Sequence, residues 1–229
     1  VLNEKKEIIQ EFVQPTGWSS VDTAEEIHQK LELAGINLSD DSSCCVATGY
    51  GRISVPYADK TVTEITCHAL GAVHLFQQPD LTVIDIGGQD TKIIQIEQGF
   101  VKDFIMNDKC AAGTGRFLEV MANTLSLRPN EMFDLARMGS DTTISSMCTV
   151  FAESEVIGLI GKGEPKENIA YAVVDSTIRK VTAQLSRMNG EMSTFCLTGG
   201  LCECEYIREA LSKELKIAME PVIYWLHRL

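Results

Sequence analysis

Residues 81–106, LTVIDIGGQDTKIIQIEQGFVKDFIM, carry the pattern that most restricts how this chain can fold. The stretch contains three runs rich in β-branched and aromatic residues, separated by Gly87-Gly88 and by Gln98-Gly99. Such runs, with turn residues between them, predict strands joined by short loops. We therefore expect an antiparallel meander of three strands with a tight loop at its first junction. The expected strands are Leu81–Ile86, Thr91–Ile96 and Phe100–Ile105.

Helical and strand patterns alternate over the rest of the chain, which predicts a fold of the α/β class. Ser19, Ser20 or Asp22 would begin the first helix as its N-cap, and Gly35 would end it. The charged stretch of residues 1–13 is expected to form one strand or two short ones. Helices are expected within 19–35, 62–78, 114–125, 130–138, 151–161, 166–189 and 203–213, and further strands within 43–52, 193–200 and 215–219.

The 229-residue chain has an ordinary globular composition, with 45% hydrophobic and 23% charged residues. Its formal net charge of -12 argues against nucleic-acid binding, because that binding depends on basic side chains that neutralise phosphates. No apolar run approaches the roughly 18 residues needed to span a bilayer, so no membrane association is expected. The N-terminus does not resemble a secretion signal. The eight cysteines therefore indicate cytoplasmic thiols or metal ligands rather than a disulfide framework.

Two motifs place a glycine pair directly after an apolar strand: VIDIGGQDTK at 83–92 and FCLTGG at 195–200. Glycines in such turns allow backbone N–H groups to approach an anion without obstruction from Cβ atoms. Asp85, at the strand end, could hold a hydrated Mg²⁺ ion, and Gln89 could orient an attacking water. The alternative is a β-hairpin whose glycines only supply positive φ angles. The sequence G-x-x-x-x-G-K-S/T is absent, which argues against a P-loop ATPase.

These motifs resemble those of a known superfold. DIGGQDTK looks like the second phosphate loop of the actin, sugar-kinase and heat-shock ATPases, and LTGG looks like their adenosine-binding turn. Together with MNDKCAAGTGRFLEVMA and CTVFAESEVI, they resemble one family more closely. That family is the ATP-dependent activators of 2-hydroxyacyl-CoA dehydratases, which are related to the ATPase subunits of benzoyl-CoA reductase. The likeness extends from about Gly49 to about Leu211.

The resemblance implies an actin-like (ribonuclease H-like) α/β fold with two subdomains around a nucleotide cleft. Residues 1–80 would be the remainder of the N-terminal ATPase subdomain, and residues 81–229 the C-terminal one. Family members open with a strand that carries a D-x-G-S/T-x-x-x-K phosphate loop, whereas VLNEKKEIIQ is similar to the segment that follows it. We therefore expect the chain to lack the first strand and the first phosphate loop. The final residues, MEPVIYWLHRL, also differ from the Gly/Ala-rich helix expected there.

The resemblance also assigns nucleotide roles to residues of this sequence. Asp85 and Gln89 would serve Mg²⁺ and the hydrolytic water during catalysis. The glycine loop would hold the phosphates, the Gly113–Gly115 turn would also face the nucleotide, and the second glycine turn would flank the adenosine. The expected nucleotide-binding residues are Gly87, Gly88, Gln89, Asp90, Gly113, Thr114, Gly115, Thr198, Gly199 and Gly200.

Two cysteines differ from the other six in their neighbours. Cys110 precedes Ala-Ala-Gly-Thr-Gly and a helical pattern, and Cys148 precedes a second helical run. Both thiols would lie near helix N-termini, where the partial positive charge favours thiolate. One chain offers two ligands from this pair and a 4Fe–4S cluster takes four, so a twofold dimer would complete the set. The resemblance implies the same arrangement. Cys202 and Cys204 form a C-x-C pair that we expect not to bind metal.

The implied activity couples ATP hydrolysis to electron transfer. The protein would take an electron from a donor such as ferredoxin or flavodoxin and pass it, at low potential, to a separate iron–sulfur 2-hydroxyacyl-CoA dehydratase. Two alternatives remain open on the sequence alone. One is a sugar- or acid-kinase-like phosphotransferase on the same superfold, and the other is an iron–sulfur scaffold that does not hydrolyse ATP.

Overall fold

The structure is a computed structural model that describes residues 1–40, 42–145, 148–189, 194–216 and 219–221. The described chain divides into two compact units, which are treated separately below. The first unit contains residues 1–75, and the second contains the described residues from Phe76 onward.

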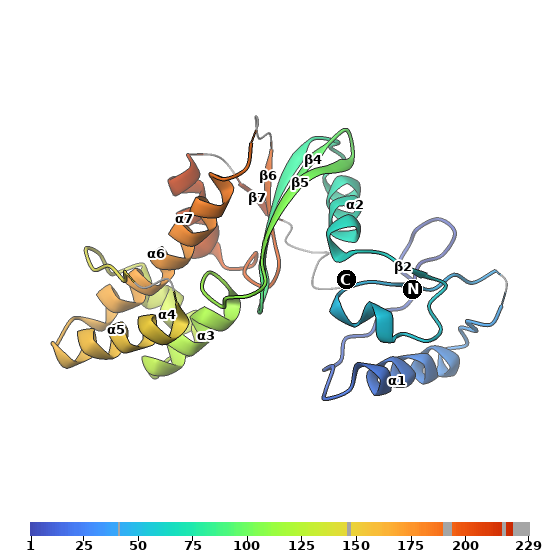
Figure 1. The fold of residues 1–229 in the computed structure, drawn as a ribbon, viewed down its shortest axis with the longest axis horizontal. Helices are drawn as coiled ribbons and strands as arrows, with labels where there is room; N and C mark the ends of the chain where they lie inside the picture. The colour runs from blue at the N-terminus through green and yellow to red at the C-terminus, as the bar shows by residue number, and fades with distance from the viewer. Residues whose placement is uncertain (41, 146–147, 190–193, 217–218, 222–229) are drawn as a thin grey trace. The chain divides into compact units, whose positions relative to one another are not determined.

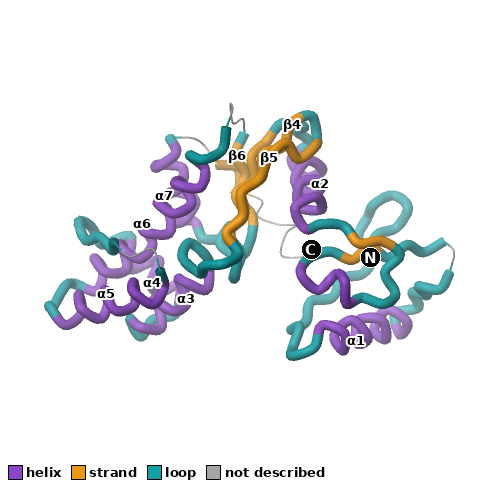
Figure 2. The backbone as a smooth tube through the Cα atoms, viewed as in Figure 1, coloured by secondary structure: helices purple, strands orange, loops and turns teal. Residues whose placement is uncertain are grey.

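Figures 1 and 2 show the course of the chain and its helices and strands. In order, the elements are α1 (Ser20–Leu33), β1 (Val46–Ala47), the 3₁₀ helix η1 (Tyr50–Ser54), β2 (Lys60–Thr61), α2 (Glu64–Phe76), β3 (Leu81–Ile86), β4 (Thr91–Glu97), β5 (Phe100–Asn107), α3 (Gly115–Thr124), α4 (Pro129–Ala136), α5 (Thr149–Gly161), α6 (Lys166–Leu185), β6 (Phe195–Thr198), α7 (Glu205–Leu215) and β7 (Met219–Pro221).

The second unit is built on a five-stranded sheet in the order β5-β4-β3-β6-β7. Strands β3, β4 and β5 pair antiparallel, which confirms the predicted meander. β4 and β5 extend slightly beyond the prediction, to Glu97 and Asn107. Strands β6 and β7 add in parallel on the other side of β3. The parallel strands end at the same edge of the sheet, next to the loop that joins β3 to β4.

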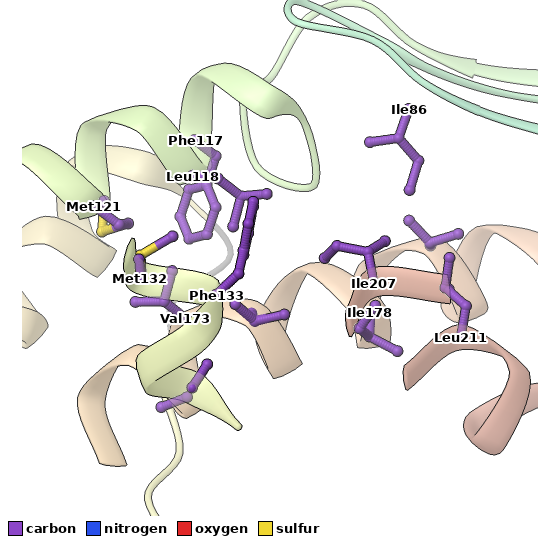
Figure 3. Packing of buried hydrophobic residues seen from close by; sticks show 14 of the residues in the cluster. Ile86, Phe117, Leu118, Met121, Met132, Phe133, Val173, Ile178, Ile207 and Leu211 are labelled. Atoms are coloured by element: carbon purple, nitrogen blue, oxygen red, sulfur yellow. The ribbon is translucent and has the colours of Figure 1, made fainter. Parts of the chain in front are cut away.

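Helices α3 to α7 gather on one side of this sheet (Figure 1). The sheet contributes Ile84, Ile86 and Ile93 to the core, and all three side chains are fully buried. Figure 3 shows Phe117, Met132 and other helical side chains packed together in the same cluster. β3 is buried on both faces, which explains its continuous apolar sequence. Burial of this core is the main force that holds the second unit together.

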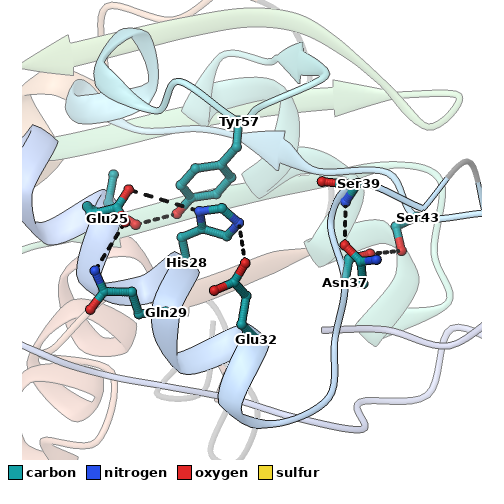
Figure 4. Close-up of polar contacts among 9 residues, drawn as sticks. Glu25, His28, Gln29, Glu32, Asn37, Ser39, Ser43 and Tyr57 are labelled. Atoms are coloured by element: carbon teal, nitrogen blue, oxygen red, sulfur yellow. Dashed lines mark hydrogen bonds and ion pairs between the residues drawn. The ribbon is translucent and has the colours of Figure 1, made fainter.

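The first unit contains α1, which begins and ends as the sequence predicts. Ser19 is its N-cap, and the Ser19 hydroxyl accepts a hydrogen bond of 3.1 Å from the backbone N–H of Asp22. Figure 4 shows polar contacts of the helix and of the segments near it, where His28 stacks on Tyr57 with ring centroids 4.8 Å apart. The Tyr57 hydroxyl donates to the backbone carbonyl of Ala24 at 2.7 Å. These contacts join α1 to the segment that follows η1.

Substitution of Ser19 by alanine is expected to destabilise α1 by about 1 kcal/mol, because one N–H of the first turn loses its acceptor. Hydrogen exchange at the Asp22 amide measures the change, since it reports local opening of this helix. Ser19→Asp should retain the protection, because a carboxylate also accepts at this position. Equal exchange rates in Ser19→Ala and the unmodified protein would show that the cap contributes nothing.

The prediction of one or two strands within residues 1–13 is wrong. In the structure these residues make an isolated antiparallel bridge between Leu2 and Ile8, without a strand. The side-chain oxygen of Asn3 accepts from the backbone N–H groups of Lys5 and Glu7, both at 2.9 Å. A local side-chain bond of this kind competes with pairing between strands, which is why the alternation of apolar residues was misleading.

The chain end bears on two further expectations. The strand expected within 215–219 is β7, which lies slightly later, at Met219–Pro221. The rest of the C-terminal stretch, 222–229, lies outside the described residues.

Among the described helices, none has the length and apolarity needed to cross a membrane.

Candidate nucleotide and thiol site

Three residues from neighbouring strands form a row at one edge of the sheet. Asp85 on β3 is the register partner of Lys92 on β4 and of Thr198 on β6. The Thr198 hydroxyl donates to Oδ1 of Asp85 at 2.9 Å, and Nζ of Lys92 donates to Oδ2 at 3.3 Å. The row lies where β3 and β6 end, and ligands of open α/β sheets bind beyond the carboxyl ends of the strands. The register therefore marks this edge as the candidate site.

Lys92 is the buried positive charge of the row. Its side chain is 2% exposed, and its Nζ also lies 2.8 Å from Oδ1 of Asp90. Both aspartates are buried as well, so one ammonium neutralises part of the charge of two carboxylates. Sequence reasoning missed this role, because lysine is among the residues most often exposed. The hairpin register could have indicated this role, because it places Lys92 opposite Asp85. Lys92 also follows Asp90 by two positions in the sequence.

The predicted phosphate loop is a tight connection between β3 and β4. The backbone N–H of Gly87 donates to the carbonyl of Asp90 at 3.0 Å and closes the turn. Neither Gly87 nor Gly88 has a positive φ angle, so the hairpin alternative does not explain the glycine pair. Gly88 and Gln89 are exposed, and a Cβ added at Gly88 would meet open space. The loop thus presents accessible backbone, as an anion-binding turn requires.

The second glycine turn packs directly against the end of β3. Gly199 has a φ of +81°, and a Cβ added there would lie 2.5 Å from the carbonyl oxygen of Ile86 and 2.7 Å from Oδ1 of Asp85. A side chain is excluded at this position by both the backbone conformation and the close approach. At the next residue, Gly200, the corresponding space is open. The turn therefore has one glycine that the fold requires and one that faces free volume.

A pocket of about 630 Å³ adjoins Gly200. It lies between α4 and the start of α7, and its volume is in the range of small-ligand sites. Arg137 forms part of the wall, with its guanidinium 5.2 Å from the ring centre of Tyr206 and ion-paired at 2.6 Å with Glu209. An aromatic ring and polar groups around such a space suit a nucleoside base.

The Cys110 turn connects to the phosphate loop through the start of α3. Thr114 is the N-cap of α3, but its side chain makes no capping bond to the helix. The first N–H groups of the helix instead bond the loop: Gly115 donates to the Gly87 carbonyl at 2.9 Å, and Arg116 donates to the Gly88 carbonyl at 2.8 Å. The glycine loop thus caps α3, and the predicted residues of both motifs lie together.

Cys148 is the N-cap of α5 and is exposed, whereas Cys110 is partly exposed in its turn. Three other thiols are less suited to metal binding, because burial raises their pKa and favours the protonated form. Burial raises the pKa of Cys196 to about 12, and it also raises the pKa values of Cys202 and Cys204. The interpretation of Cys202 and Cys204 as non-ligands stays a prediction.

The described residues of one chain contain no group of three or more cysteine, histidine or carboxylate side chains that could hold a metal ion. A 4Fe–4S cluster takes four thiolates. The donor chemistry of Cys110 and Cys148 suits such a cluster, and neither residue is buried. The residues present therefore fit a cluster shared between two chains rather than one contained in a single chain.

The sheet order and the helices on one side of the sheet make this an α/β protein, and the solved structures similar to it have the actin-like ATPase fold. Residues 1–225 match the sequence profile described as the BadF/BadG/BcrA/BcrD ATPase family, and the chain belongs to that family.

Known proteins of this family are similar along most of their length. The (R)-2-hydroxyglutaryl-CoA dehydratase activating ATPase of Acidaminococcus fermentans is 41% identical over 225 residues, which cover 96% of this chain and 84% of that protein. The crystal structure of the (R)-2-hydroxyglutaryl-CoA dehydratase component A from A. fermentans superposes with a TM-score of 0.78 at 39% identity, covering 93% of this chain and 83% of the other.

A second solved structure adds a bound nucleotide analogue. The activator of the 2-hydroxyisocaproyl-CoA dehydratase from Clostridium difficile, with bound ADPNP, superposes with a TM-score of 0.73 at 34% identity. The match covers 90% of this chain and 75% of that one.

Proposed function

We propose that this protein is an ATP-driven activator that passes a low-potential electron to a separate 2-hydroxyacyl-CoA dehydratase. The observation that carries the proposal is the pair of bonds from Gly115 and Arg116 to the glycine loop. They join the loop suited to phosphate directly to the helix that follows Cys110. A nucleotide site and a candidate metal-ligating thiol therefore share one rigid connection within the second unit. The functions of the relatives described above agree with this arrangement.

Each part of the site has a role in ATP binding and hydrolysis. The backbone of Gly87 and Gly88 receives the phosphates, and the exposed side chain of Gln89 orients the attacking water. The turn at Thr198–Gly200 flanks the adenosine. Both oxygens of Asp85 already accept bonds from Thr198 and Lys92, so a Mg²⁺ ion would be held through its water shell.

The two cysteines provide the electron-transfer site. Cys110 and Cys148 of two copies would together hold one 4Fe–4S cluster, which supplies one-electron chemistry at low potential. The protein would therefore act as a homodimer, reduced by a donor such as ferredoxin or flavodoxin. None of the cysteines in the described part of the chain forms a disulfide, which suits a reducing cytoplasm.

Anaerobic reconstitution with iron and sulfide tests the cluster. The unmodified protein is expected to bind about two iron atoms per chain, one half of a shared cluster, and to show visible absorption. Cys110→Ser and Cys148→Ser should each reduce bound iron to background and weaken the dimer, because each removes two of the four ligands. Iron analysis and sedimentation measure the two effects.

Cys44→Ser is the matched control, since Cys44 is also exposed but lies in the first unit. It should leave iron content unchanged. Retention of iron by either Cys110→Ser or Cys148→Ser would show that the assigned ligand is wrong. The reconstituted protein should then support ATP-dependent turnover of an iron–sulfur 2-hydroxyacyl-CoA dehydratase. ATP-dependent phosphorylation of a sugar or organic acid by a colourless protein would instead establish a phosphotransferase.

A further inference from the structure

We propose that Thr91 and Asn107 are positioning residues that transmit the nucleotide state of the glycine loop to the Cys110 thiol. The proposal rests on the function proposed above. It names the side chains that couple the glycine loop to the Cys110 thiol. Both residues belong to the second unit, and neither is expected to touch the nucleotide or the metal itself.

The two residues occupy equivalent places at one end of the meander. Thr91 is the first residue of β4, directly after the glycine loop, and Asn107 is the last residue of β5. They are register partners across the two strands. The pair therefore stands between the loop and the turn that carries Cys110.

Each side chain holds a different part of the Cys110 turn. The buried hydroxyl of Thr91 donates to the carbonyl of Gly113 at 2.6 Å. The Nδ2 group of Asn107 donates to the carbonyl of Cys110 at 2.8 Å and to that of Ala112 at 3.0 Å. Because an amide NH₂ group carries two donors and both acceptors are carbonyls, this orientation of the Asn107 amide satisfies both bonds.

Further contacts hold the Cys110 turn in addition to the bonds from Thr91 and Asn107. The hydroxyl of Thr114 bonds the carbonyl of Ala111 at 2.6 Å, and Gly113 has a φ of +86°. A Cβ at Gly115 would lie 3.3 Å from the carbonyl oxygen of Gly87, so the helix start and the loop are in close approach. A phosphate that changes the loop therefore changes the bonds of Thr91 and of α3 at once, and the Cys110 backbone follows.

Alkylation of Cys110 in the cluster-free full chain tests this coupling without reference to dehydratase activity. The rate of modification by N-ethylmaleimide is followed by mass spectrometry of the Cys110 peptide, with and without saturating Mg-ADP, under anaerobic conditions. Cys44 serves as the internal reference. In the unmodified protein, nucleotide is expected to change the Cys110 rate by at least about fivefold, the lower end of typical coupling between sites.

Thr91→Val and Asn107→Ala should each bring the ratio of the Cys110 alkylation rates with and without nucleotide close to one. Calorimetry gives the affinity of each variant, so that nucleotide can be kept at a saturating concentration. Thr91→Ser keeps the hydroxyl and should retain the response. The matched control is Thr82→Val, because Thr82 is a buried β3 threonine whose hydroxyl has no hydrogen-bond partner among the described residues. It should behave as the unmodified protein does.

A wild-type response in both Thr91→Val and Asn107→Ala would overturn the proposal. An unchanged alkylation rate of Cys110 when nucleotide binds to the unmodified protein would also overturn it. In that case the proposed function would still stand, provided that the protein binds iron. A protein that binds neither nucleotide nor iron would fail the proposed function as well. If Thr91→Val does not fold, Asn107→Ala and Thr91→Ser decide the question.

Discussion

Replacement of Lys92 by methionine is expected to lower the free energy of unfolding of the second unit by about 3–5 kcal/mol. Methionine fills nearly the same space, so the effect isolates the charge. Without the ammonium, the buried carboxylates of Asp85 and Asp90 lose the cation that both of them contact. Hydrogen exchange at the β3 and β4 amides measures the loss, because amides of these buried strands exchange only when the second unit opens.

Lys102→Met is the matched control. Lys102 lies on β5 of the same sheet and pairs with Glu97 at 2.7 Å, but both side chains are about half exposed. Water screens this pair, so its loss should change stability by about 0.5 kcal/mol or less. A Lys92→Met protein as stable as Lys102→Met would show that the buried ion pairs contribute no more than a surface pair.

Substitution of Gly199 by alanine is expected to destabilise the site edge by about 3 kcal/mol or more, since a strained φ angle and an overpacked contact add together. The new methyl group would lie 2.5 Å from the carbonyl oxygen of Ile86, a backbone atom that cannot move without shifting β3. Thermal unfolding measures the stability, and calorimetry measures ADP binding, which should be lost.

Gly200→Ala changes the neighbouring residue of the same turn, where a Cβ meets open space. It should fold with nearly unchanged stability. If adenosine lies against this turn, as proposed, the added methyl group should still weaken ADP binding. Equal stability of the Gly199→Ala and Gly200→Ala proteins would contradict the close approach of the turn to β3. Unchanged ADP affinity in Gly200→Ala would contradict the position proposed for the adenosine.

The sequence was most informative where local patterns determine structure. The β3–β4–β5 meander could be predicted because its strands are consecutive and its turns contain glycine. The start of α1 could be predicted because a serine N-cap acts on the residues directly after it. The prediction of strands within residues 1–13 was wrong, because alternation of apolar residues does not reveal whether a partner strand exists. The bonds of Asn3 within its own turn decided the outcome there.

The candidate site could be predicted as motifs but not as contacts. The register of β3 with β6 is a tertiary property, and it alone brings Thr198 beside Asp85. The role of Asn107 was missed for a similar reason, since it depends on a neighbouring turn, whereas the role of Lys92 was missed because lysine is usually exposed. The metal and nucleotide roles of Cys110 and Cys148, Asp85 and Gln89 remain predictions that the experiments above examine.

The bond between Thr198 and Asp85 joins residues 113 positions apart in the chain. The meander, in contrast, forms from adjacent segments that leave the ribosome together. Contacts of such long separation form slowly, because the loop between them must close first. During synthesis, the hairpin with its buried charges is therefore complete well before β6 arrives to finish the site. The protein should acquire affinity for nucleotide only after β6 has been synthesised and has paired with β3.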